Sequence, residues 1–81
     1  MGCDLQMHDV VALLDDMPAQ HFVSGKPLQL RRGQIGTIVM AYAGGTFEVE
    51  FATADGRTYA LLPIPAAGLM LLHDTPGEAA A

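Results

Sequence analysis

The segment TFEVEFATADGRTYALL, residues 46–62, decides the fold class of this chain. Residues 46–52 alternate strictly between two kinds of side chain, and the apolar kind comprises Phe47, Val49 and Phe51. Glu48 and Glu50 occupy the positions between them. Because successive side chains of a β-strand point to opposite faces of a sheet, this alternation predicts a strand with one buried and one solvated face.

A turn and a second strand are expected directly after this strand. Ala54-Asp55-Gly56 predicts a three-residue loop with glycine in the left-handed conformation. Residues 57–62 predict the returning strand. That loop length places Phe51 opposite Tyr59 and Val49 opposite Leu61, and such cross-strand pairs stabilise a hairpin.

The sequence on either side predicts further β-structure. The β-branched residues of segment 35–42 (IGTIVMAY) indicate a strand before a turn at 43–45. Pro63 and Pro65 are expected to end the strand 57–62, because proline fixes φ and has no N–H group. A turn of 3₁₀ helix and a last short strand are then expected, at residues 65–68 and 69–73.

The N-terminal half has a less definite local pattern. Residues 7–17 (MHDVVALLDDM) place apolar side chains at helical spacing, yet the run VVALL within them also suits a buried strand. A three-stranded meander cannot by itself bury its apolar face and protect both edges, whereas five short strands curled into a small barrel do both. We therefore interpret residues 9–14 as the first strand and residues 18–33, which have no clean period, as a long loop after it.

Length and composition restrict the class of protein. The 81 residues suit a single domain, with an ordered body over about residues 7–73 and a flexible tail over 74–81. The formal charge of −5 opposes binding to nucleic acid, which requires cations that neutralise phosphates. No apolar run reaches the roughly 18 residues that a membrane helix needs. The single cysteine, Cys3, excludes an internal disulfide and indicates a reducing compartment, so we expect a cytoplasmic protein.

Four segments, taken in order, resemble one known family. They are DVVALL (9–14), RGQIGTIV (32–39), FEVEF (47–51) and DGRTYAL (55–61). Over roughly residues 8–73 the chain resembles the bacterial family of domain of unknown function 4926. This resemblance implies a small SH3-like β-barrel and no particular activity. The order of these segments is also similar to the barrels of the nitrile hydratase β-subunit and of the ferredoxin–thioredoxin reductase variable chain, which are non-catalytic scaffolds docked on a larger partner.

Residues with catalytic or metal-binding chemistry form no known motif. His8, His21 and His73 have none of the spacings of a metal site. The pairs His8-Asp9 and His73-Asp74 approach each other if the first and last strands are neighbours, but exposed polar residues at strand ends are the simpler interpretation. Gly33-x-x-Gly36 precedes a strand rather than a helix, so we interpret it as backbone flexibility and not as a phosphate loop. We predict no catalytic residue, no metal and no cofactor.

The C-terminal strands are more apolar than one buried face requires. Excess apolar side chains of this kind are expected to lie on the surface or beneath a partner. The predicted partner-binding residues are Leu61, Leu62, Ile64, Leu69, Leu71 and Leu72, together with Phe22, Arg31 and Arg32 from the long loop.

These residues predict a non-catalytic protein–protein interaction module that binds a protein partner or forms a homo-oligomer. Small size and the charge of −5 suit an acidic neutraliser of a basic protein, as in antitoxin or immunity systems. The alternative is an accessory or scaffold subunit that docks on a larger enzyme. A metal- or small-ligand-binding protein is a third interpretation with less support.

Overall fold

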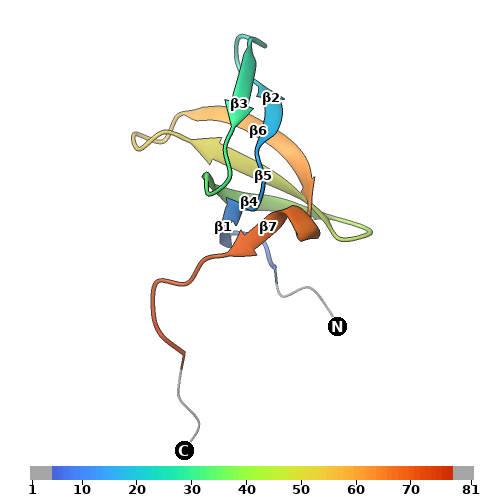
Figure 1. Cartoon of the computed structure of the whole chain (residues 1–81), viewed down its shortest axis with the longest axis vertical. Coiled ribbons are helices and arrows are strands. Elements are labelled where there is room, and N and C mark those ends of the chain that lie inside the picture. Colours follow the sequence, from blue (N-terminus) through green and yellow to red (C-terminus); the bar gives the residue numbers. More distant parts are fainter. Residues whose placement is uncertain (1–4, 78–81) are drawn as a thin grey trace, which may run out of the picture.

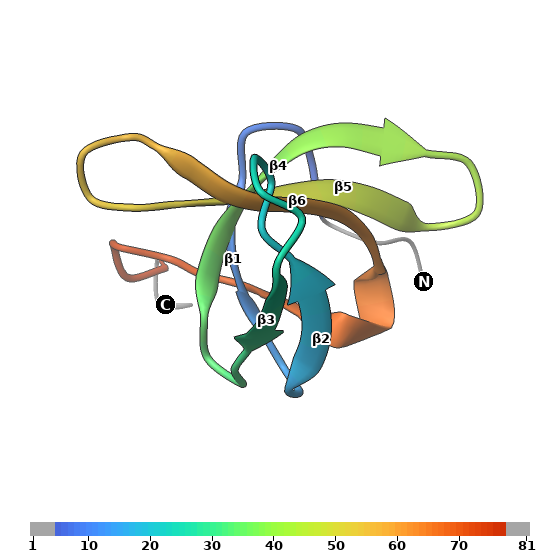
Figure 2. The same ribbon diagram turned by 90° about the horizontal axis from the view of Figure 1, so that it is seen from above.

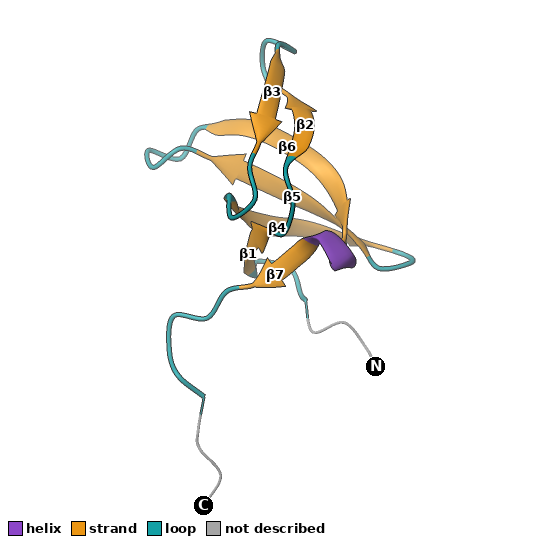
Figure 3. Cartoon of the chain, in the orientation of Figure 1, coloured by secondary structure: helices purple, strands orange, loops and turns teal. Residues whose placement is uncertain are grey.

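The computed structural model describes residues 5–77, which form β-strands and one short helical turn (Figure 1 and Figure 3). The strands are β1 (Val10–Leu13), β2 (Met17–Gln20), β3 (Pro27–Leu30), β4 (Ile35–Tyr42), β5 (Thr46–Ala52), β6 (Thr58–Pro65) and β7 (Leu69–Leu71). A turn of 3₁₀ helix, η1 (Ala66–Gly68), links β6 to β7. The all-β class and the strands expected at 35–42 and 46–52 are confirmed.

These strands form two antiparallel sheets. The larger has the strand order β6-β5-β4-β1-β7, and the smaller is the β2–β3 hairpin. Strand β1 pairs with both β4 and β7, so the first and last strands are neighbours, as the barrel hypothesis required. The barrel itself is not closed: β6 and β7 are the two edges of a curled sheet and do not pair with each other (Figure 2).

The long loop expected over residues 18–33 is instead the β2–β3 hairpin. Met17 pairs with Leu30 at its base, and Gln20 pairs with Pro27 next to its tip. Pro18 and Pro27 obscured these strands in the sequence, but a two-stranded sheet has two free edges at which a missing N–H group costs little. Figure 1 shows the hairpin extending past β6, across the direction of the strands in the larger sheet.

The register of the β5–β6 hairpin differs from the expected one by one residue. Phe51 pairs with Ala60 and Val49 with Leu62, rather than with Tyr59 and Leu61. The register shifts near Ala52, which pairs with Thr58, so one extra residue is accommodated in β6 as a bulge. The Phe51 and Tyr59 rings still lie near each other, with centroids 6.4 Å apart.

Strand β6 also continues through both prolines that were expected to end it. Pro63 pairs with Glu48 and Pro65 with Thr46. Because β6 is the edge strand of the larger sheet, a residue whose backbone nitrogen faces away from β5 needs no N–H donor. The same two prolines deprive β6 of donors that closure of the barrel would use.

The core lies between the larger sheet and the hairpin. The buried apolar cluster draws on β1, β3, β4, β5, β6 and β7, and its largest fully buried side chains are Val11, Leu30, Ile38, Val49, Phe51 and Ile64. Leu30 is 1% exposed and fixes the hairpin to the body. The paired strands therefore close over one small core, to which the hairpin contributes.

Glycine is required at the two positions of the RG-x-x-G segment for different structural reasons. Gly33 has φ +88°, a left-handed conformation that favours glycine, at the turn before β4. Gly36 lies in β4 where a Cβ would stand 2.6 Å from Val49 Cγ1 and 3.0 Å from the Glu50 carbonyl oxygen. The first glycine permits the turn, and the second permits β4 to pass close over β5.

Candidate functional site

The predicted partner-binding residues do not form one surface. Ile64 and Leu69 are 2% and 7% exposed and belong to the core, so they are not available to a partner in the folded chain. The alternation of β6 explains the first, because Ile64 pairs with the inward-facing Phe47. Leu69 pairs with Leu13, which is likewise buried.

Phe22 lines one depression with Leu61 and Leu62 and a second with Val23 and Tyr59. We call these five residues together the hairpin surface. The Phe22 N–H donates to the Tyr59 carbonyl at 2.8 Å and holds the hairpin tip against the edge of β6. The tip itself is ordered by His21, whose Nδ1 accepts from the N–H groups of Val23 and Ser24. Phe22 and Val23 remain exposed, so this surface ends in two uncovered apolar side chains.

Leu71 and Leu72 lie on the other side of the molecule, in a shallow depression that they share with His8, Asp9, Val10, His73 and Asp74. The Leu72 N–H donates to the Val10 carbonyl at 3.0 Å, and this pairing of β7 with β1 brings the two His-Asp pairs to one place. Both leucines are half-buried. Across residues 5–77, no group of three or more His, Cys, Asp or Glu side chains is placed to hold a metal ion. Cys3 is outside the described residues.

Arg31 and Arg32 lie in the turn between β3 and β4. The Arg31 N–H donates to Gln34 Oε1 at 2.9 Å, and the Arg32 N–H donates to Asp16 Oδ1 at 2.7 Å. Both arginines are exposed. The structure therefore places them at the far end of β1 from His8 and Asp9, beside an aspartate.

One exposed apolar group on the larger sheet was not among the predicted residues. Val10 pairs with Thr37, Ala12 pairs with both Ile35 and Met70, and directly paired residues carry their side chains on the same face of a sheet. Since Val11 and Leu13 point into the core, this second set points outward. We call it the sheet face, defined by Val10, Ala12, Ile35 and Met70.

The sheet face consists of three exposed side chains around a buried one. Val10, Ile35 and Met70 are 44%, 58% and 49% exposed, whereas Ala12 between them is only 4% exposed. A contiguous apolar group of this kind on a small monomer is typical of a contact surface. The signal was present in the sequence: in the run VVALL, every residue is apolar, so the outward positions of β1 are as apolar as the inward ones.

Carboxylates on neighbouring strands border the sheet face. Thr37 pairs with Val10 on one side and with Glu50 on the other, so Glu50 lies on the same face as the apolar set. Glu48 pairs with Met40 further along β5. The Thr58 hydroxyl donates to Glu50, and the Tyr42 hydroxyl donates to Glu48 Oε1 at 3.0 Å. The bond to Glu48 raises the pKa of Tyr42 above its ordinary value, and desolvation and the negative charge of Glu48 add to this effect.

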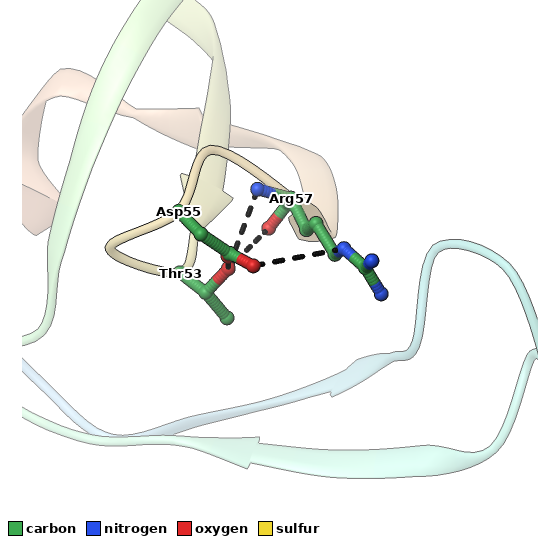
Figure 4. Close-up of polar contacts among 3 residues, drawn as sticks. All are labelled: Thr53, Asp55 and Arg57. Atoms are coloured by element: carbon green, nitrogen blue, oxygen red, sulfur yellow. Dashed lines mark hydrogen bonds and ion pairs between the residues drawn. The ribbon is translucent and has the colours of Figure 1, made fainter.

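The ion pair in the described part of the chain lies beside the hairpin surface, because Thr53 and Arg57 line one depression together with Phe22, Val23 and Tyr59. Arg57 Nε stands 3.7 Å from Asp55 Oδ2 in the β5–β6 turn, where Thr53 also contacts Asp55 and Arg57 (Figure 4). The turn is closed by the Thr53 N–H, which donates to the Arg57 carbonyl at 2.9 Å. Both ionic side chains are mostly exposed, and such pairs contribute little to stability. These residues form a turn and not a reactive centre.

Comparison with known proteins gives one match. No curated protein and no solved structure matches the chain. No helix in residues 5–77 is long and apolar enough to cross a membrane. A family model, described as "Domain of unknown function (DUF4926)", matches residues 7–71, which contain every strand of the structure. Because the match covers most of its length, the chain belongs to the DUF4926 family.

Proposed function

We propose that this protein is a non-catalytic protein–protein interaction module and that the sheet face is its contact surface. The observation that carries the proposal is the exposure of Val10, Ile35 and Met70 around the buried Ala12. Burial of exposed aliphatic side chains such as these contributes roughly 25 cal/mol per Å² of apolar area removed from water.

Rigidity of the surface supports the same proposal. The four residues come from β1, β4 and β7, three paired strands whose opposite faces are in the core. A contact surface on paired strands loses little conformational freedom when a partner binds. The hairpin surface differs, because its exposed Phe22 and Val23 lie at the tip of a two-stranded hairpin.

We further propose that the curled sheet is a small SH3-like barrel with an open seam. The supporting features are the neighbouring first and last strands, the hairpin inserted between β1 and β4, and the 3₁₀ turn before β7. In this arrangement the module binds through side chains on the outside of the sheet, and no chemistry takes place on it.

Site-specific photo-crosslinking tests the proposal. A photoreactive amino acid replaces Ile35 in the full chain, which is produced in its source cells and irradiated. The matched control carries the same amino acid at Ala54, which is exposed in the β5–β6 turn away from the sheet face. A discrete protein adduct at residue 35 that is missing at residue 54 is expected. No adduct at residue 35, or the same adducts at both positions, contradicts the proposal.

A further inference from the structure

Four carboxylates border the sheet face, two along β5 and two at the depression beside Val10. Glu50 lies beyond Thr37 in the same row as Val10, and Glu48 lies further along β5. Asp9 directly precedes Val10, and Asp74 lines the same depression as Val10. In the part of the chain that the structure describes, none of these four carboxylates has a Lys, Arg or His partner within ion-pair distance.

At the opposite end of β1, the chain has two positive and two negative side chains. Arg31 and Arg32 lie there with Asp15 and Asp16, and the backbone of Arg32 is bonded to Asp16. Their turn leads into Ile35, so these two arginines lie beyond the Ile35 end of the sheet face. The other two cations, Lys26 in the β2–β3 turn and Arg57 in the β5–β6 turn, lie in turns that contribute no residue to the sheet face. At the Val10 end of the sheet face and along β5, the formal charges at pH 7 are therefore those of the four carboxylates, with His8 and His73 beside Asp9 and Asp74 in the depression.

We propose that the partner at the sheet face is a basic protein, whose contact surface places apolar side chains on Val10, Ile35 and Met70 and places Lys or Arg beside Glu48, Glu50, Asp9 and Asp74. This proposal rests on the function proposed above and names the chemistry of the partner. Carboxylates without internal cations are free to attract an external cation, and opposite surface charges speed the encounter of two proteins.

A second copy of this chain fits the surface less well. Each copy has a formal charge of −5. Two sheet faces in contact bring their carboxylate borders within about one Debye length, roughly 8–10 Å at physiological salt, where like charges still repel. The four carboxylates therefore favour a cationic partner over self-association.

The test uses the protein that crosslinks at residue 35, purified and titrated with the full chain. Three chains are compared: wild type, the triple variant E48Q/E50Q/D74N, and the control D55N. Each glutamine or asparagine side chain removes the negative charge, keeps nearly the same shape and retains one acceptor oxygen. Asp55 is already paired with Arg57 in the β5–β6 turn. Binding is measured at low and high NaCl, about 50 mM and about 500 mM, which brackets strong and weak screening.

Removal of charge at the sheet face is expected to weaken binding about tenfold at low salt and to have little effect at high salt, with D55N changing it less than about twofold. The wild-type dissociation constant is expected to rise with salt. If an adduct forms at residue 35 but the triple variant binds as tightly as wild type, or the adduct is a second copy of the chain, the basic-partner proposal is wrong while the interaction function stands. If no adduct forms at residue 35, both proposals are wrong.

Discussion

The replacement of Gly36 by alanine is the sharpest single test of how β4 passes over β5. An added Cβ would lie 2.6 Å from Val49 Cγ1, 2.9 Å from Phe51 Cε1 and 3.0 Å from the Glu50 carbonyl oxygen. Ordinary contacts between carbon atoms are about 3.5–4.0 Å, so both carbon atoms are too close, and the carbonyl oxygen at 3.0 Å is a tight contact. Val49 and Phe51 are fully buried, and the Glu50 oxygen belongs to the strand paired with β4. The surroundings therefore have no free space into which they can move.

The expected loss follows from overpacking of a small core. Forcing extra atoms into a close-packed site costs about 1–3 kcal/mol. A domain of this size has a total free energy of unfolding of about 4–12 kcal/mol, so the loss is a large fraction of it. A change of 1 kcal/mol shifts Tm by about 4–8 °C in a domain of 60–100 residues, and Gly36→Ala is accordingly expected to lower Tm by about 5–20 °C.

Two other glycines serve as controls in thermal and urea unfolding followed by circular dichroism. At Gly68 a Cβ would meet only Ile64 Cγ2, at 3.3 Å, and φ is not positive, so Gly68→Ala is expected to cost less than the change at Gly36. At Gly33 the space is empty but φ is +88°, so Gly33→Ala measures backbone strain alone, about 1–2 kcal/mol.

A double mutant separates the steric cause from others. Val49→Ala removes the Cγ1 atom that the new methyl group would meet, so the cost of Gly36→Ala is expected to be smaller in the Val49→Ala background than in wild type. A Tm for Gly36→Ala within error of wild type, or strict additivity of the two changes, would refute the close approach of β4 and β5 as the reason for glycine at this position.

Three further changes test other parts of the structure by unfolding or titration. Leu30→Ala removes the 1%-exposed side chain that joins the hairpin to the core. It is expected to lower the free energy of unfolding in urea by about 2–5 kcal/mol. A loss no larger than that of substitutions at exposed sites, about 0.5 kcal/mol, would show that the hairpin is not anchored there. Ile64→Asn is expected to unfold the chain at 25 °C or nearly so, whereas Leu61→Asn on the outer face of the same strand should leave Tm within a few degrees, and equal effects would contradict the register of β6. Tyr42 is expected to ionise above its ordinary pKa of 10.0 in absorbance titrations, and Glu48→Gln is expected to return its pKa toward that value. Because the pKa is raised in the folded state, the contribution of the Tyr42–Glu48 hydrogen bond to stability is present below pH about 10 and is lost as the pH rises through the raised pKa. An unchanged titration of Tyr42 in the variant would show that Glu48 is not the cause.

The parts of the fold with a clear period were predicted with nearly correct bounds. Strands β4 and β5 coincide with the expected segments 35–42 and 46–52. The β-branched residues before a turn at 43–45 indicated the first, and the alternation of Phe47, Val49 and Phe51 indicated the second; both are local properties of the sequence. The first strand was assigned by a global argument, the need to protect an edge, and β1 indeed lies between β4 and β7. The first inference depends on the local pattern of residues, and the second on the need to cover an apolar face and a strand edge; both can be worked out from the sequence.

The errors share a cause, which is that register and edge position are tertiary properties. The bulge beside Ala52 leaves Ala52 opposite Thr58, as expected, and shifts the pairs from Phe51 to Thr46 by one residue; no local signal fixes where an extra residue is accommodated. Pro63 and Pro65 indicated the end of a strand in the sequence, because only the topology shows that β6 is an edge strand, where proline is tolerated. The same uncertainty placed Ile64 on a surface, although its partner Phe47 had been assigned correctly to the core.

The candidate surface shows a related limit. The run VVALL was interpreted as suiting a buried strand, and the outward-facing residues of β1 were not considered as a surface. Only the pairing of Ala12 with Ile35 and Met70, from strands distant in the sequence, reveals that these residues form one exposed group. Contact surfaces assembled across strands are therefore found from topology and not from a single segment.

The prolines of β6 have a consequence for the behaviour of the chain in a crowded solution. An unpaired strand edge is a template on which another chain can add a strand, and growth of fibrils and exchange of strands between molecules begin at such edges. On β6 the Tyr59 carbonyl is already occupied by the hairpin, and Pro63 and Pro65 offer no N–H group to an incoming backbone. The opposite edge, β7, is only three residues long. A chain that is half apolar by composition is thus protected at its longer edge against templated polymerisation, and recognition of other proteins is left to its side chains.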